Sequence, residues 1–399
     1  MSEGAPWLVI IGLGEDGPEG LSPASRAALE RAEIIMGPPR HLALLPDMGA
    51  ERVEWPVPFA DGLDLLEGYR GRQVAVLASG DPFWFGAGSV IARRFEPGEW
   101  QALPGVSCFS LAAARLGWAL DKVLCLGHHA APLTRLRPSL APGVRMILTQ
   151  RDGDAVADLG GYLAGLGFGA SRLWVMEALG GPRERVTEVQ AGSVSGVFSH
   201  PVVVAVEIAG EGAVLPCTSG IDDGFFDSDG VMTKRPVRAL TLSALAPKPG
   251  ERLWDIGGGS GSIGIEWLLS HPTTDAVAIE TRADRIALIR ANAAALGVDR
   301  LQVVEGRAPE ALAGLDAPDV VFVGGGLSGV LLDWLFSHLP GGTRLVANAV
   351  TLESEAQLIA AHAARGGDLL RIELAQAAAL GPRRGWKAAY PVVQWSVTL

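Results

Sequence analysis

The stretch Leu253-Trp-Asp-Ile-Gly-Gly-Gly-Ser-Gly-Ser-Ile-Gly-Ile-Glu266 decides the fold of the second half of this 399-residue chain. The apolar run that ends at Ile256 is typical of a buried strand, four glycines follow within five residues, and a helix is predicted from Ser262. Glycines let the backbone approach a ligand closely, and the first turn of a helix offers free N–H donors. This order predicts a ligand-binding loop at the carboxyl end of a parallel strand.

Two acidic residues end neighbouring predicted strands in this region. Asp255 ends the first, and Glu280 ends the next, where an acid suits the hydroxyls of a ribose. The spacing Gly259-x-Gly261-x-x-Gly264 also fits the dinucleotide pattern, with Glu280 about 20 residues further on. Enzymes that use S-adenosylmethionine (SAM) share this arrangement, and their first acid faces the ammonium of the methionine part. The position of Asp255 therefore favours SAM over NAD.

Strand-like and helix-like segments alternate along both halves, which predicts an α/β fold with a mostly parallel sheet. In the second half we predict strands at 251–256, 276–280, 301–304, 320–323, 344–350, 369–376 and 392–398, and helices at 262–270, 283–296 and 352–365. Residues 209–232 are rich in Gly, Asp and Ser and have no sustained period. We therefore predict a domain over 1–208, a linker over 209–232 and a second domain over 233–399.

Three glycine-bearing loops follow predicted strands in the first half. They read Ile11-Gly-Leu-Gly14, Ala78-Ser-Gly-Asp-Pro82 and Leu103-Pro-Gly-Val-Ser107. Any one of them is compatible with simple turn chemistry. Since each follows a strand, the three together predict one crevice at the carboxyl ends of a sheet.

The composition excludes several classes of protein. Thirty-three Lys and Arg against 44 Asp and Glu give a net charge of −11, which provides no overall field for nucleic acid or an anionic membrane. The three cysteines fall in no C-x-x-C spacing, so neither a disulfide framework nor a metal site is predicted. No basic leader and no apolar run of membrane-spanning length is seen, so we expect a cytoplasmic protein.

The first half resembles the class III SAM-dependent tetrapyrrole methyltransferases, in the branch that acts on precorrin-6. The matching segments are Gly12-x-Gly14, Gly37-Pro-Pro-Arg-His41, Ala78-Ser-Gly-Asp-Pro82, Pro104-Gly-Val-Ser107, Ala114-Arg-Leu-Gly117 and Val204-Ala-Val-Glu-Ile208. The family's first loop usually continues as Pro-Gly, whereas this chain has Glu15-Asp16. The cofactor contact usually made by that Pro is therefore in doubt.

The second half resembles the decarboxylating precorrin methyltransferases. The match runs through Met232-Thr-Lys234, Val237-Arg-Ala-Leu-Thr241, Leu253-Trp-Asp-Ile-Gly257, Gly259-Ser-Gly-Ser262, Gly306-Arg-Ala-Pro309, Val323-Gly-Gly-Gly326 and Ala347-Asn-Ala-Val-Thr-Leu-Glu353. Together the two resemblances imply a two-lobed class III domain followed by a Rossmann-like class I domain.

The resemblance implies two methyl transfers from SAM to the meso carbons C5 and C15 of a corrin precursor, with loss of carbon dioxide from an acetate side chain. The cofactor-binding residues that it implies are Gly12, Gly14, Gly80, Asp81, Ser107, Met176, Thr233, Asp255, Gly257, Gly258, Gly259, Ser260, Gly261, Glu280 and Ala308. The substrate-binding candidates are Arg40, His41, Arg238, Gly324, Gly325 and Gly326, and the catalytic candidates are Lys234 and Asn348. A substrate with many carboxylates needs local cations, for which Arg344 and Arg383-Arg384-x-x-Lys387 are further candidates. We expect a homo-oligomer.

Two other readings stay open on the sequence alone. One is a dinucleotide-dependent oxidoreductase that uses the glycine loop at 257–264. The other is a carrier that binds corrinoid intermediates without acting on them. Binding of NAD(P)H without SAM would indicate the first, and retention of a tetrapyrrole without methyl transfer would indicate the second.

Overall fold

The computed structural model describes residues 6–399, which divide into two compact units. Among the described residues, the first unit comprises 6–133 and Ala141–Ala213, and the second comprises Thr134–Leu140 and Val214–Leu399. Across the described residues, no helix combines the length and the apolar character that a bilayer span requires.

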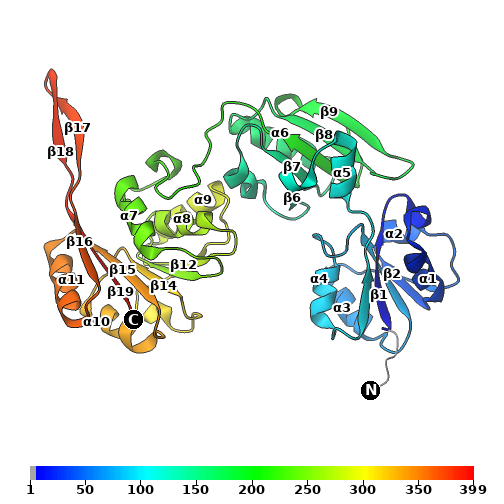
Figure 1. The fold of residues 1–399 in the computed structure, drawn as a ribbon, viewed down its shortest axis with the longest axis horizontal. Coiled ribbons are helices and arrows are strands. Elements are labelled where there is room, and N and C mark those ends of the chain that lie inside the picture. Colours follow the sequence, from blue (N-terminus) through cyan, green and yellow to red (C-terminus); the bar gives the residue numbers. More distant parts are fainter. Residues whose placement is uncertain (1–5) are drawn as a thin grey trace. The chain divides into compact units, whose positions relative to one another are not determined.

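The first lobe of the first unit is a fully parallel sheet in the order β3-β2-β4-β1-β5 (Figure 1). Its strands are β1 (Leu8–Leu13), β2 (Ile34–Gly37), β3 (Glu51–Glu54), β4 (Val74–Ser79) and β5 (Trp100–Leu103), and its helices are α1 (Pro23–Arg31), α2 (Pro39–Leu44), α3 (Phe59–Glu67) and α4 (Gly88–Arg94). β1 is buried along its whole length, as expected of a central strand covered on both faces. The carboxyl ends of β1, β4 and β5 lie at one edge because the three strands are parallel.

The second lobe has a sheet in the order β6-β7-β10-β8-β9, and only β6 and β7 pair in parallel. Its elements are α5 (Cys108–Leu116), β6 (Leu124–Gly127), β7 (Arg145–Thr149), α6 (Ala155–Gly165), β8 (Arg172–Glu177), β9 (Arg185–Gln190) and β10 (Val202–Glu207). This mostly antiparallel sheet departs from the parallel arrangement expected of alternating segments. The connection between β8 and β9 is too short for a crossover helix, so these strands form a hairpin.

The second unit is built on a sheet in the order β13-β12-β11-β14-β15-β19-β16. Its strands are β11 (Arg252–Ile256), β12 (Asp275–Glu280), β13 (Gln302–Glu305), β14 (Val320–Val323), β15 (Arg344–Ala349), β16 (Asp368–Ile372) and β19 (Val392–Thr398). The first five are parallel, and β19 is antiparallel to both β15 and β16.

Helices cover both faces of this sheet. They are α7 (Arg235–Leu245), α8 (Ser262–Ser270), α9 (Ala283–Ala295), α10 (Gly329–His338) and α11 (Leu352–Arg365). One apolar cluster contains residues of α7, α8 and α9, and a second on other strand positions contains residues of α10 and α11. A hairpin of β17 (Ala375–Leu380) and β18 (Arg383–Ala388) extends away from the sheet and carries the Arg383-Arg384-x-x-Lys387 group (Figure 1).

Residues 214–232, within the predicted linker, pack onto the second unit. Leu215, Ile221 and Phe226 are buried in the same apolar cluster as residues of α7, α8 and α9. The backbone N–H groups of Gly220 and Ile221 donate to the Glu266 carboxylate. Widely spaced apolar residues among Gly, Asp and Ser have no period that sequence reading detects, although they are buried.

Candidate functional sites

Three glycine loops meet at one edge of the first sheet. The Gly80 N–H donates to the Leu13 carbonyl at 3.0 Å, and the Gly105 N–H donates to the Gly80 carbonyl at 2.9 Å. A Cβ placed on Gly12 would lie 1.8 Å from the Gly80 carbonyl oxygen and 2.3 Å from the Gly105 nitrogen. The loops after β1, β4 and β5 thus pack backbone against backbone, as their placement after parallel strands predicts.

A cavity of about 700 Å³ opens beside these loops in the first unit. The predicted site residues that line it are Gly14, Arg40, His41, Gly80, Asp81, Ser107 and Met176. Gly12 supports the loops from outside the lining. Aromatic side chains of Trp55, Phe59, Trp84 and Phe85 add a large apolar surface that sequence reading missed. A cavity of this size and lining suits a large planar ligand with polar edges.

An acidic residue of the first loop pairs with two arginines at this cavity. Glu15 is 8% exposed, and its carboxylate accepts hydrogen bonds from Arg40 and, at 3.2 Å, from Arg183. Burial lowers the pKa of Arg40, and the charge of Arg183 lowers it further. Arg40, predicted to bind the substrate, therefore already has a carboxylate partner. Glu15 replaces the usual Pro of the loop, and that departure was the one available signal of its role.

His41 lies beside Arg40 and is buried. The Arg40 guanidinium lies 2.8 Å from His41 Nε2, and a guanidinium can only donate, so Nε2 is the acceptor. Burial first, and then the Arg40 charge, lower the pKa of His41 to about 4. His41 is therefore neutral at pH 7 and presents an imidazole, not an imidazolium, to this part of the cavity.

The second unit has its own cavity, of about 490 Å³, at the carboxyl ends of β11, β12, β13 and β14. The predicted site residues that line it are Thr233, Asp255, Gly257, Gly258, Gly259, Ser260, Glu280, Ala308, Gly324, Gly325 and Gly326. Gly261 caps α8 in the left-handed region, with φ of 78°, and does not line the cavity. The structure thus brings together residues from five loops that are as far apart in sequence as 233 and 326.

The carboxylates of the two predicted acids accept hydrogen bonds from the backbone of the glycine loop and of the segments beside it. Asp255 is 1% exposed, and its Oδ2 accepts the Gly264 N–H at 3.0 Å. Glu280 accepts the Gly259 N–H at 3.0 Å through one oxygen, and the N–H groups of Thr281 and Arg282 through the other. Both carboxylates therefore have backbone partners in this structure, while both still line the cavity. A carboxylate oxygen has two acceptor positions, so each can take a further donor from a ligand.

The glycines after β14 pack against the glycines after β11. A Cβ on Gly257, whose φ is 76°, would lie 2.6 Å from the Gly325 nitrogen. The Gly324 N–H donates to the Ile256 carbonyl at 2.9 Å. Gly324, Gly325 and Gly326 were predicted to bind the substrate. The close approach of the two loops requires glycine at position 257, whereas a Cβ on Gly325 would come no closer than 3.6 Å to the Gly257 backbone.

Both catalytic candidates lie outside the cavity lining. The Asn348 amide on β15 donates to Thr241 Oγ1 at 2.8 Å and accepts from Gln394 at 3.0 Å, which places it in a side-chain network beneath α7. Lys234 is exposed, and its Nζ lies 3.8 Å from Asp223. Arg344 forms an ion pair with Glu251 at 2.7 Å. The structure thus gives Asn348 and Arg344 structural partners in place of the predicted substrate contacts.

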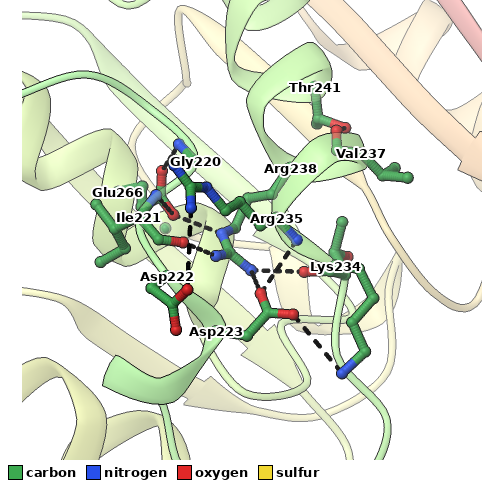
Figure 2. Close-up of polar contacts among 12 residues, drawn as sticks. Gly220, Ile221, Asp222, Asp223, Lys234, Arg235, Val237, Arg238, Thr241 and Glu266 are labelled. Atoms are coloured by element: carbon green, nitrogen blue, oxygen red, sulfur yellow. Dashed lines mark hydrogen bonds and ion pairs between the residues drawn. The ribbon is translucent and has the colours of Figure 1, made fainter. Parts of the chain in front are cut away.

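The structure contradicts the predicted substrate contact of Arg238. Its side chain is 0% exposed, so it cannot reach a substrate in the cavity. Its guanidinium donates to Glu266 and Asp223 and to the carbonyls of Ile221 and Thr233 (Figure 2). Val237, Arg238, Thr241, Leu242 and Leu245 form the buried face of α7, and this helical spacing was the signal that would have placed Arg238 inside.

Three arginines that sequence reading passed over line the second cavity instead. Arg282 and Arg285 share the carboxylate of Asp229 at 3.4 Å and 2.8 Å. Arg307, two residues after the end of β13, is exposed and forms no ion pair with any described residue. A free guanidinium at a cavity mouth is suited to bidentate capture of a carboxylate.

The buried environment of Asp255 predicts that the stability of the second unit depends on pH. Burial, and secondarily the charge of Glu280, raise its pKa from 3.8 to about 7. Between about pH 4 and pH 7, Asp255 is protonated in the folded state but ionised in the unfolded state. The free energy of unfolding should therefore fall as pH rises through this window. Asp255→Asn keeps an acceptor for Gly264 and should stabilise the second unit at pH 8 by roughly 2–4 kcal/mol. Urea unfolding of both proteins at pH 5 and pH 8 measures this, and an equal difference at both pH values would contradict it.

Two family models match the chain. One is described as Tetrapyrrole (Corrin/Porphyrin) Methylases and matches residues 7–195, and the other is described as a Precorrin methyltransferase domain and matches residues 224–399. A Sinorhizobium sp protein named precorrin-6Y C(5,15)-methyltransferase (decarboxylating) is 49% identical over 400 residues, covering 99% of this chain and 97% of the relative.

Two shorter relatives come from Salmonella typhimurium (strain LT2). The cobalt-precorrin-6B C(15)-methyltransferase (decarboxylating) is 33% identical over 178 residues, which cover 43% of this chain and 91% of the relative. The cobalt-precorrin-7 C(5)-methyltransferase is 24% identical over 200 residues, which cover 50% of this chain and 98% of the relative. Each of these relatives is matched over nearly its whole length by about half of this chain.

Proposed function

Because the chain belongs to the precorrin-6Y C5,15-methyltransferase (decarboxylating) family, we propose that it methylates a precorrin-6 macrocycle at C5 and C15 and removes carbon dioxide from an acetate side chain, giving precorrin-8. The observation that carries the two-site form of this proposal is the presence of two separate cavities, each beside glycine loops at the ends of parallel strands. All the relatives reported above are named as methyltransferases, which does not support the dinucleotide or carrier alternatives.

We assign C5 methylation to the first unit and C15 methylation with decarboxylation to the second. In Salmonella typhimurium, two separate proteins are named for the C5 and the C15 activities, and the C15 protein is also the decarboxylating one. The resemblance of residues 233–399 to the decarboxylating precorrin methyltransferases supports this order. The predicted domains 1–208 and 233–399 remain the proposed limits of the two activities.

SAM fits the second cavity by the chemistry of its lining. Glu280 has acceptor capacity for ribose hydroxyls, Asp255 offers a carboxylate for the ammonium group, and the glycine loop leaves the backbone accessible. In the first cavity we propose Gly14, Gly80, Asp81, Ser107 and Met176 as cofactor contacts. SAM supplies a methyl group on a sulfonium leaving group, so the protein needs no nucleophile of its own.

The chain's own part in the reaction is to position the substrate against the methyl group and to exclude water. Holding the meso carbon in line with the methyl group can supply roughly 7–11 kcal/mol of the barrier. Each methylation replaces a meso C–H by C–CH₃ and releases one proton. Decarboxylation leaves the C–C bonding electrons on the substrate, where the conjugated ring can accept them, and one proton must then be added to form the methyl group. Arg307 is a candidate carboxylate contact at the second cavity.

Calorimetric titration of the intact chain with S-adenosylhomocysteine tests the proposal. We expect two sites per chain, and no detectable heat with NADH. The product formed from precorrin-6B and SAM should gain two methyl groups and lose one carbon dioxide by mass spectrometry. A single site, or a product with one methyl group from the unmodified chain, would contradict the two-site proposal. Homo-oligomeric assembly and a cytoplasmic location remain predictions of the sequence.

A further inference from the structure

We propose that Arg238 is a positioning residue for cofactor binding in the second unit, because it holds the wall of the cavity formed by Val231, Met232 and Thr233. This inference rests on the proposed use of SAM at that cavity. It replaces the substrate contact predicted for Arg238 with a role that the geometry supports.

The wall needs an anchor because it has little structure of its own. Residues 229–234 are in neither a helix nor a strand, and Val231 is 63% exposed. Polar contacts hold the segment at both ends. The Asp227 N–H donates to Asn292 at 2.9 Å, Asp229 pairs with Arg285 at 2.8 Å, and the Thr233 carbonyl accepts from Arg238 at 2.6 Å. Arg238 is therefore the anchor at the carboxyl end of the wall.

The planar guanidinium serves four partners at once. Nε donates to Glu266 at 2.5 Å, Nη2 donates to the Ile221 carbonyl, and Nη1 donates to both Asp223 and the Thr233 carbonyl (Figure 2). The guanidinium also lies over the Phe226 ring, 4.8 Å from its centroid. An ammonium group has no rigid fork and cannot reach partners on several sides together.

Glu266 connects this network to the glycine loop. It lies on α8, the helix that starts directly after Gly261, and it also accepts the N–H groups of Gly220 and Ile221. One end of the ion pair is thus fixed to the helix below the loop, and the other end holds the Thr233 carbonyl. The pair sets the distance between two walls of the same cavity.

Stability alone does not account for this arrangement. A buried ion pair loses much of its Coulombic gain to desolvation, and a well-packed apolar pair often gives equal stability. An apolar pair could not donate to the Thr233 carbonyl. The feature that only arginine provides here is the simultaneous hold on Glu266 and on the cavity wall.

The test is Arg238→Lys in the full chain. Lysine can keep the charge beside Glu266 but loses the carbonyl contacts. We expect the KM for SAM in C15 methylation to rise at least tenfold, with kcat at saturating SAM within about twofold of the unmodified protein. The KM for SAM in C5 methylation should not change. Arg235→Ala is the matched control, because Arg235 is an exposed arginine on the same helix, with only a 3.9 Å pair to Asp222.

A second variant keeps the test valid if Arg238→Lys does not fold. Arg238→Met combined with Glu266→Gln is neutral, and the Gln oxygen can still accept from Gly220 or Ile221. It should show the same tenfold rise in KM with a cooperative melting transition. An unchanged KM in either folded variant overturns the inference, as does an equal loss at both methylations or a loss confined to kcat. A single S-adenosylhomocysteine site in the unmodified chain would instead contradict the proposed function, so the two failures are distinguishable.

Discussion

Gly12→Ala should abolish C5 methylation while C15 methylation and decarboxylation continue. The added Cβ would lie 1.8 Å from the Gly80 carbonyl oxygen and 2.3 Å from the Gly105 nitrogen. Both are backbone atoms, so no side-chain rotation relieves the clash, and the loops after β4 and β5 must move apart. A displacement of about 1 Å in a site of this kind can cost about 100-fold in rate, and we expect at least that loss.

Mass spectrometry of the product measures this effect. The variant should accumulate a compound with one added methyl group and one lost carbon dioxide. Gly161→Ala is the control, because Gly161 lies inside α6 with open space around its Cβ position and alanine favours a helix. Full C5 methylation by a folded Gly12→Ala protein would show that the three-loop contact is not needed for the first site.

Glu280→Ala should remove the second cofactor site. The Glu280 carboxylate is 5% exposed and accepts from the N–H groups of Gly259, Thr281 and Arg282, and its removal leaves these donors without that partner. The glycine loop would then lose the contact that orients Gly259, and the ligand would lose its proposed ribose acceptor. We expect the affinity for S-adenosylhomocysteine at this site to fall at least 100-fold, so that calorimetry detects one site per chain.

The neighbouring strand provides a matched control for this experiment. Glu305 is the register partner of Glu280 on β13, and it is exposed and outside the cavity lining. Glu305→Ala should therefore retain two sites. Two sites of unchanged affinity in Glu280→Ala would show that the loop and the ribose do not depend on this carboxylate.

Local signals in the sequence predicted several elements closely. The predicted helices at 262–270 and 352–365 match α8 and α11, because caps and stops such as Thr351 and Gly366 act within one turn. The β17–β18 hairpin was not predicted, since the run near 369–376 was read as one strand. Its exposed residues have no buried face, and so no hydrophobic period, to detect.

The site residues also divide into those that local sequence signals predict and those that they do not. Asp255 and Glu280 follow from their positions at strand ends, and both line the second cavity. The roles of Arg307 and Glu15 depend on which residues lie near them in the folded protein, and a single sequence does not contain that information. Arg238 was predicted to be one of the local cations that a substrate with many carboxylates needs, whereas the face of α7 on which it lies determines its partners.

The position of β19 in the second sheet affects folding during synthesis. Residues 392–398 insert between β15 and β16, and Trp395 is fully buried in the second unit. The second sheet therefore stays split until those residues have been translated and have left the ribosome. The strands of the first unit end at Glu207, so both of its sheets can close much earlier. During synthesis, the unfinished second unit is the part that exposes open strand edges and depends most on protection from aggregation.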